Sequence, residues 1–124
     1  MGNIISIMIG GALGAIARYQ LGAWISTKWN QGFPVHTLII NITGAFLLGF
    51  LNILFTERFK IDPMWSLGIG VGFLGAYTTF STLSYEVFTL LESGSYITAG
   101  LYVFLSLLLG LLFAALGVGL ARLI

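Results

Sequence analysis

Four long apolar segments dominate this chain and constrain its fold more than any other feature. They cover approximately residues 4–25, 34–55, 64–91 and 97–122, and short polar stretches separate them. A helix needs about 20 mostly apolar residues to cross the hydrocarbon core of a bilayer. Each segment is long enough, so we predict an all-α integral membrane protein with four transmembrane helices in a single domain, residues 1–124.

The composition supports this fold class and excludes several kinds of function. Only 7% of the residues are charged and 58% are hydrophobic, whereas roughly a quarter of the residues in a soluble domain are charged. The chain has no cysteine and a single histidine, which excludes a disulfide framework and a cysteine-based metal site. A net charge of +1 without a basic patch predicts no nucleic-acid partner.

Polar and aromatic residues mark the ends of the expected helices. The first helix should end near Lys28 and Asn30, and Pro34 suits the first turn of the second helix. Asp62 followed by Pro63 is a helix-start signal, which predicts that the third helix begins there. Four aromatic residues lie near segment ends, as in the aromatic belts at the two membrane interfaces, namely Trp24, Trp29, Trp65 and Tyr96.

The few basic residues outside the apolar segments specify the membrane orientation weakly. Lys28 lies on one side, whereas Arg58, Lys60 and Arg122 lie on the other. Positive charge favours the cytoplasmic side. The bias places both termini inside, but so few charges are also compatible with insertion in both orientations.

Small residues recur at four-residue spacing in every expected helix. Such spacing lets helix backbones approach closely inside a membrane. The pattern could serve packing within the chain alone, or it could also form a dimer interface. We favour oligomerisation because four helices do not easily enclose a polar pathway. The pairs are Gly10 with Gly14, Ala45 with Gly49, Gly68 with Gly72, and Gly110 with Ala114.

The third segment carries polar residues where the centre of a membrane helix is expected. As an α-helix it would be about 42 Å long, which exceeds the hydrocarbon thickness of about 30 Å. Its centre, residues 75–82, reads GAYTTFST. Non-helical backbone at this depth requires burial in protein or access to water. We predict a break that frees carbonyls for a small cation and hydroxyls for an anion. The alternative is a continuous helix whose hydroxyls bond to carbonyls one turn earlier.

Three ionisable residues lie within or beside apolar segments. Arg18 should face the protein interior or a water-filled cavity, or extend its side chain to the interface. Glu86 lies deep enough in the third segment to require a partner. His36, close to a helix start, is expected to be an interfacial residue rather than a ligand.

Uncharged polar residues on the other segments extend this pattern without forming a catalytic group. Asn41 suits either helix–helix hydrogen bonding or a polar pore lining. Tyr102 and Ser106 share one face of the fourth helix. The hydroxyls have no neighbouring base to activate them, so we predict that the protein is not an enzyme. A small-ion channel or transporter, a proton-coupled drug exporter and a structural membrane subunit remain.

Three motifs occur in order along the chain. Residues 10–19 read GGALGAIARY, residues 41–46 read NITGAF, residues 75–82 read GAYTTFST, and Glu86 follows. Together they resemble the Fluc (CrcB) family of fluoride channels over essentially the whole chain. The resemblance implies an antiparallel, dual-topology dimer with two pores. Such a dimer would export fluoride passively across the bacterial inner (plasma) membrane.

The same resemblance assigns roles to particular residues. A structural sodium ion at the dimer axis would bind the backbone carbonyls of Gly75 and Thr78. Asn41 would meet fluoride in the vestibule, and Phe80 would present its ring edge to the anion. Arg18 would add positive potential at the pore mouth. The remaining residues of the fluoride pathway would be Ser81, Thr82, Tyr102 and Ser106.

Two departures from the family pattern affect the choice of partner. Leu83 stands where the family usually has a second phenylalanine, and Gly110 stands where a serine is common. We favour a homodimer, with a heterodimer of two family members as the alternative. A small multidrug-resistance-type exporter would need a carboxylate in the first helix, but the first carboxylate of this chain is Glu57.

Overall fold

The computed structural model describes residues 1–29 and 31–124, which contain helices and no strand. The first half of the chain forms α1 (Gly2–Lys28) and α2 (Val35–Ile53), and α2 continues as the π-helical turn η1 (Leu54–Arg58). The all-α prediction is confirmed. The expected helix end near Lys28 agrees with α1, whereas Asn30 lies outside the described residues.

The second half of the chain contains one shorter run of helix, an interruption and two further helices. The run consists of α3 (Pro63–Leu67), the π-helical η2 (Gly68–Leu74) and α4 (Gly75–Tyr77). After the interruption come α5 (Phe80–Glu92) and α6 (Tyr96–Leu123). Asp62 caps α3 as predicted, because its side chain accepts a 2.8 Å hydrogen bond from the N–H of Met64.

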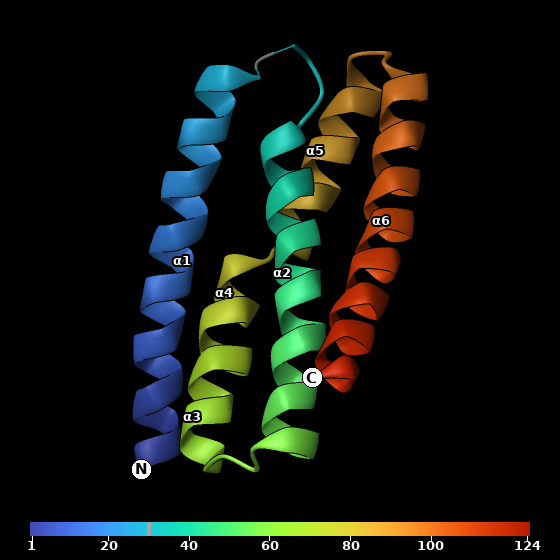
Figure 1. Cartoon of the computed structure of the whole chain (residues 1–124). Helices are drawn as coiled ribbons and strands as arrows, with labels where there is room; N and C mark the ends of the chain where they lie inside the picture. The colour runs from blue at the N-terminus through green and yellow to red at the C-terminus, as the bar shows by residue number, and fades with distance from the viewer. Residues whose placement is uncertain (30) are drawn as a thin grey trace.

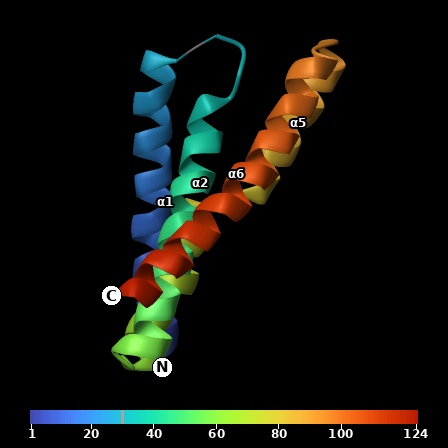
Figure 2. The ribbon, with the colours of Figure 1, turned by 45° about the vertical axis from the view of Figure 1, so that its right-hand side comes forward.

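The helices lie side by side and alternate in direction (Figure 1). The chain rises along α1, returns along α2, rises again through α3 to α5, and returns along α6. The main packing contacts join α2 to α6 and α1 to η2. Figure 2 shows that α5 and the first half of α6 lean together away from α1 and α2, so α6 crosses α2 at an angle.

Glycines bring α1 and η2 into backbone contact. A Cβ atom on Gly10 would collide with the carbonyl oxygen of Gly68, and one on Gly14 would collide with that of Phe73. A Cβ atom on Gly72 would lie 2.7 Å from the carbonyl oxygen of Ile7. Two of the small-residue pairs, Gly10 with Gly14 and Gly68 with Gly72, therefore serve helix packing within the chain.

Small residues also bring α2 and α6 close together, near the C-terminal end of α6. A Cβ atom on Gly49 would lie 2.6 Å from the carbonyl oxygen of Ala114. Gly110, however, has open space around it among the described residues. Gly117 instead meets the carbonyl of Phe46. Because α6 diverges from α2 towards its N-terminal end, only its C-terminal half comes this close.

Three helices in the described residues are long and apolar enough to cross a membrane, namely Gly2–Lys28, Val35–Arg58 and Tyr96–Leu123. Their outer faces carry many large exposed hydrophobic side chains, including Leu107 and Leu111. The buried core is small and includes Ile25, Ile40 and Leu74. A chain that exposes this much apolar surface is suited to lipid rather than to water.

Candidate functional site

The interruption between α4 and α5 is formed by two threonines in extended conformation. Thr78 has φ −85° and ψ 162°, and Thr79 has φ −153° and ψ 125°. The hydroxyl of Thr78 donates to the carbonyl of Leu74 at 3.0 Å, and the backbone N–H of Thr78 donates to the same oxygen. The hydroxyl of Thr79 accepts a 3.2 Å hydrogen bond from the N–H of Thr82 and caps α5. Side-chain hydroxyls thus form hydrogen bonds with backbone groups at both helix ends, the end of α4 and the start of α5.

Asn41 on α2 holds the extended backbone in place. Its Oδ1 accepts a 2.9 Å hydrogen bond from the N–H of Thr79, and its Nδ2 donates at 3.0 Å to the carbonyl of the same residue. A side-chain amide that pairs both ways with one residue imitates a neighbouring strand. The interruption is therefore satisfied by a residue 38 positions earlier in the chain.

The interruption also removes a hydrogen-bond donor from Gly75. In a continuous helix the N–H of Thr79 would donate to the carbonyl of Gly75, but it donates to Asn41 instead. A Cβ atom on Gly44 would collide with Thr78, so Gly44 lets the extended segment lie directly against α2. A backbone carbonyl without its helical donor fits the chemistry of a hard cation such as Na⁺, which binds oxygen ligands.

A groove of about 350 Å³ runs along one side of the interruption. Its walls include Asn41, Gly75 and Thr78 together with Phe80 and Leu83. Phe80 is 81% exposed. The structure therefore brings the two expected carbonyl ligands, the expected vestibule amide and the expected aromatic edge to one groove.

A second, more polar cavity of about 380 Å³ lies between α1, α2 and the start of α5. Arg18 lines it and is half-buried, and no ion pair of Arg18 is formed among the described residues. Thr37, Thr79 and Thr82 lie on the opposite walls. The hydroxyl of Thr79 donates to that of Thr82 at 3.1 Å. A fixed positive charge facing hydroxyl groups suits a small anion.

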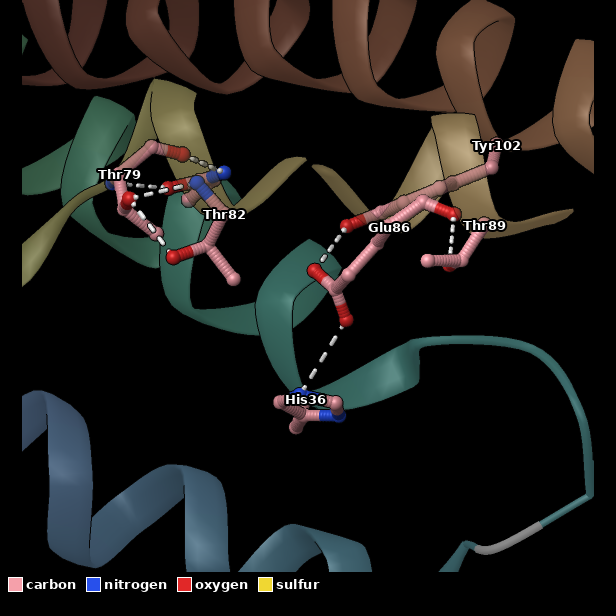
Figure 3. A network of polar contacts seen from close by, with 7 residues as sticks. His36, Thr79, Thr82, Glu86, Thr89 and Tyr102 are labelled. Carbon is pink, nitrogen blue, oxygen red and sulfur yellow. Dashed lines mark hydrogen bonds and ion pairs between the residues drawn. The ribbon is translucent and has the colours of Figure 1, made fainter. Parts of the chain in front are cut away.

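Glu86 on α5 is the centre of a third polar group, drawn in Figure 3. The hydroxyl of Tyr102 donates to Oε1 of Glu86 at 3.1 Å, and Nε2 of His36 lies 3.4 Å from Oε2. Tyr102 is fully buried, and Phe33 meets its ring edge to face at 5.4 Å between centroids. The prediction that Glu86 takes a partner is confirmed.

The remaining expected pathway residues divide between two surroundings. Ser106 lies one turn beyond Tyr102 on α6, and its buried Oγ has no hydrogen-bond partner among the described residues. Ser81 is exposed, and its Oγ lies 3.4 Å from that of Thr79. Tyr102 therefore belongs to the Glu86 group, whereas Ser81 and Thr82 lie beside Thr79 at the interruption.

Sequence reasoning missed the role of His36 and a second contact between α2 and the third helical run. The hydroxyls of Thr43 and Tyr77 lie 2.9 Å apart, which ties α2 to the end of α4. A usable signal existed for His36. Ionisable residues within apolar segments are few, and they tend to pair with one another.

Together these features define a multi-pass α-helical membrane protein with polar cavities around an interrupted helix. Its membership of a known family is equally clear. The chain belongs to the CrcB family, because the family model described as "CrcB-like protein, Camphor Resistance (CrcB)" matches residues 5–118. The resemblance found in the sequence is therefore confirmed.

Three similar proteins share the name "Fluoride-specific ion channel FluC". The protein from Roseiflexus sp. (strain RS-1) is 47% identical over 120 residues, which are 97% of each chain. The one from Oceanobacillus iheyensis is 46% identical over 98% of this chain and 92% of its own length. The one from Sulfurihydrogenibium sp. (strain YO3AOP1) is 40% identical over the full length of both chains.

Proposed function

We propose that this protein is a fluoride-selective ion channel that exports cytoplasmic fluoride passively, and that it is not an enzyme. One observation carries the proposal. The polar, interrupted helix held by Asn41 occurs in a chain 40–47% identical, over nearly its full length, to proteins named fluoride-specific ion channels. A proton-coupled drug exporter is not supported, since α1 contains no carboxylate.

In this proposal the whole chain is one transmembrane domain with four passes. Residues 63–92 supply the third pass, and the extended residues Thr78 and Thr79 lie near the middle of the bilayer. The two helical parts together are long enough to cross the hydrocarbon core. The hydrogen bonds from Asn41 satisfy the backbone groups that lipid could not. The membrane is the bacterial inner membrane.

Fluoride selectivity follows from the cost of removing its hydration water. Fluoride is small and accepts strong hydrogen bonds, so a narrow path must replace its water with close donors or with the positive edge of an aromatic ring. Arg18 and the hydroxyls of Thr79 and Thr82 offer positive potential and donors at the entrance. The ring of Phe80 offers an edge. Chloride is larger and a weaker acceptor, so the same groups would favour it less.

The pathway residues divide into an entrance and an inner track. Asn41 uses one N–H of its amide for Thr79, which leaves the second N–H to meet fluoride in the vestibule. Ser81 and Thr82 line the track beside the interruption, and Tyr102 and Ser106 line it on α6. The unpartnered hydroxyl of Ser106 supports this role, since a buried hydroxyl without a partner is costly unless a ligand supplies one.

An antiparallel dimer with a sodium ion at its axis completes the proposal. The groove that holds Gly75, Thr78 and Phe80 is open in the single chain, and a second subunit would cover it. The carbonyls of Gly75 and Thr78 would hold sodium, which would supply a fixed positive charge without a mobile side chain. We favour a homodimer. A heterodimer with another family member is the alternative, because Leu83 lines the groove where a second ring is expected.

Passive flux from liposomes tests the function directly. Purified protein is reconstituted into vesicles loaded with fluoride, and an ion-selective electrode records fluoride release after the membrane potential is clamped. An inside-negative potential drives one anion outward by about 2.3 kcal/mol per 100 mV. We expect fast fluoride release and little chloride release from matched vesicles. Equal rates for the two anions, or no release above protein-free vesicles, would contradict the proposal.

A further inference from the structure

His36 occupies an unusual position at the boundary between two cavities. It lines the polar cavity that contains Arg18 and Thr82, and it also lines a smaller cavity of about 230 Å³ that contains Glu86. Its ring lies against α1, because a Cβ atom on Gly22 would be 3.8 Å from Cδ2 of His36. Its side chain is only 34% exposed. The imidazole therefore separates the entrance from the Glu86 group.

The carboxylate of Glu86 joins His36 to the expected inner track. One oxygen faces Nε2 of His36 at 3.4 Å, and the other accepts the hydrogen bond of Tyr102 at 3.1 Å (Figure 3). The Glu86 side chain is 19% exposed, so water screens its charge only in part. An ionised carboxylate here repels a passing anion. It also accepts the hydrogen bond of the Tyr102 hydroxyl, which is then not free to donate to the anion.

Four titratable or charged groups surround the imidazole, and they come from each neighbouring helix. Glu86 on α5 faces the imidazole directly, and Tyr102 on α6 is linked to it through its hydrogen bond to Glu86. Arg18 and Tyr19 line the same cavity from α1. Glu86 is the only carboxyl group among them, and it is the one in direct contact with His36.

We propose that His36 is a positioning residue that controls fluoride conduction by holding and neutralising the carboxylate of Glu86. The inference rests on the proposed function and extends it to the regulation of the same pathway. When His36 is protonated, its Nε2–H donates to Oε2 of Glu86 in a charge-assisted hydrogen bond. The net charge of the pair is then zero. The repulsion of fluoride falls, and the hydroxyl of Tyr102 is more available to the anion.

The sign of the effect follows from histidine chemistry. Imidazole is the side chain whose charge can change within the physiological pH range, and acid favours its protonated form. The inhibitory charge of Glu86 is therefore exposed at high pH and compensated at low pH. We expect fluoride flux to rise about tenfold as the pH falls from about 8 to about 5.5, since removing one unit charge beside a path has an effect of this order.

Liposome flux measured across this pH range tests the inference with three variants. His36→Gln keeps a hydrogen-bonding side chain but cannot be protonated, and we expect a flat pH profile at the low, high-pH rate. Glu86→Gln keeps an acceptor for Tyr102 without the charge, and we expect a flat profile at the high rate. Glu92→Gln removes an exposed carboxylate near the end of α5 and should keep the pH profile of the parent. Protein-free vesicles correct for undissociated hydrogen fluoride.

The outcomes separate this inference from the function on which it rests. Because the chain has a single histidine, a parent profile retained in His36→Gln overturns the inference alone. If His36→Gln does not fold, a parent profile retained in Glu86→Gln also overturns it. A parent protein that conducts fluoride equally at every pH overturns it too. A parent that carries no fluoride at any pH overturns the proposed function, and the inference fails with it.

Discussion

Replacing Asn41 by alanine removes the two hydrogen bonds that hold the extended backbone at Thr79. Each hydrogen bond contributes a net 0.5–1.5 kcal/mol, so the pair should stabilise the interruption by about 2 kcal/mol. That energy corresponds to a roughly thirtyfold change in the equilibrium between the held and released segment. Asn41→Asp keeps the acceptor for the N–H of Thr79 but turns a carboxylate oxygen towards its carbonyl. Repulsion between these two oxygens replaces a hydrogen bond, so we expect the Thr79 carbonyl to be released.

Amide hydrogen exchange at Thr79 measures the effect without depending on conduction. The N–H of Thr79 is protected only as long as Asn41 accepts its hydrogen bond, so in Asn41→Ala its exchange should accelerate about thirtyfold. Asn52→Ala changes an exposed asparagine on the same helix and should leave Thr79 unaffected. Fluoride flux, recorded on the same samples, should fall in the order parent, Asn41→Ala, Asn41→Asp, because the carboxylate of the aspartate variant also repels the anion.

The result that refutes this reasoning is specific. If the Thr79 amide exchanges at the parent rate in Asn41→Ala, the interruption does not depend on Asn41. A loss of flux with unchanged exchange would instead assign Asn41 to direct contact with fluoride alone. The two readouts therefore separate the positioning of the backbone from the binding of the anion.

Three further predictions concern the groove and the helix packing. Phe80→Ile should lower flux about tenfold while gel filtration still shows a dimer, because the ring edge is lost but an apolar side chain still fills much of the space. Parent-like flux would exclude a ring-edge role. Leu83→Phe should raise flux in a self-paired dimer unless the larger ring costs ~1–3 kcal/mol in packing, whereas an inactive parent rescued by a co-expressed family member would establish a heterodimer. Gly14→Val should lower thermal stability in detergent, because the added valine side chain collides with the backbone of Phe73. Gly110→Ala should not lower it, because Gly110 has open space around it among the described residues. Equal stabilities of the two variants would contradict the packing of α1 on η2.

Much of the fold was predictable because its signals are local. Apolar length identified the helical segments, and the Asp62–Pro63 pair identified the start of α3. The run of hydroxyl residues at 75–82 drew attention to the segment that leaves the helical conformation. Each of these signals acts through the hydrogen bonding or hydrophobicity of neighbouring residues, so no tertiary contact is needed to find it.

The candidate site was predictable only as a set of residues. Sequence reasoning selected Asn41 and Glu86 because polar groups in apolar segments require partners. It did not identify the partners themselves. Asn41 pairs with Thr79, 38 residues away, and Glu86 pairs with His36 across two helices. Such pairs depend on how each helix is rotated about its axis, which no local pattern specifies.

The amino-acid sequence alone determined the class of the protein, its helical segments, the hydroxyl-rich stretch at residues 75–82 and its family. The tertiary structure alone decided which small residues meet and which polar groups share a cavity. Gly110 and Gly117 illustrate the difference, because both lie on α6 and only Gly117 touches α2. Side-chain spacing brings small residues to one face of a helix, but the crossing angle decides where two faces meet. That angle results from packing along the whole length of both helices.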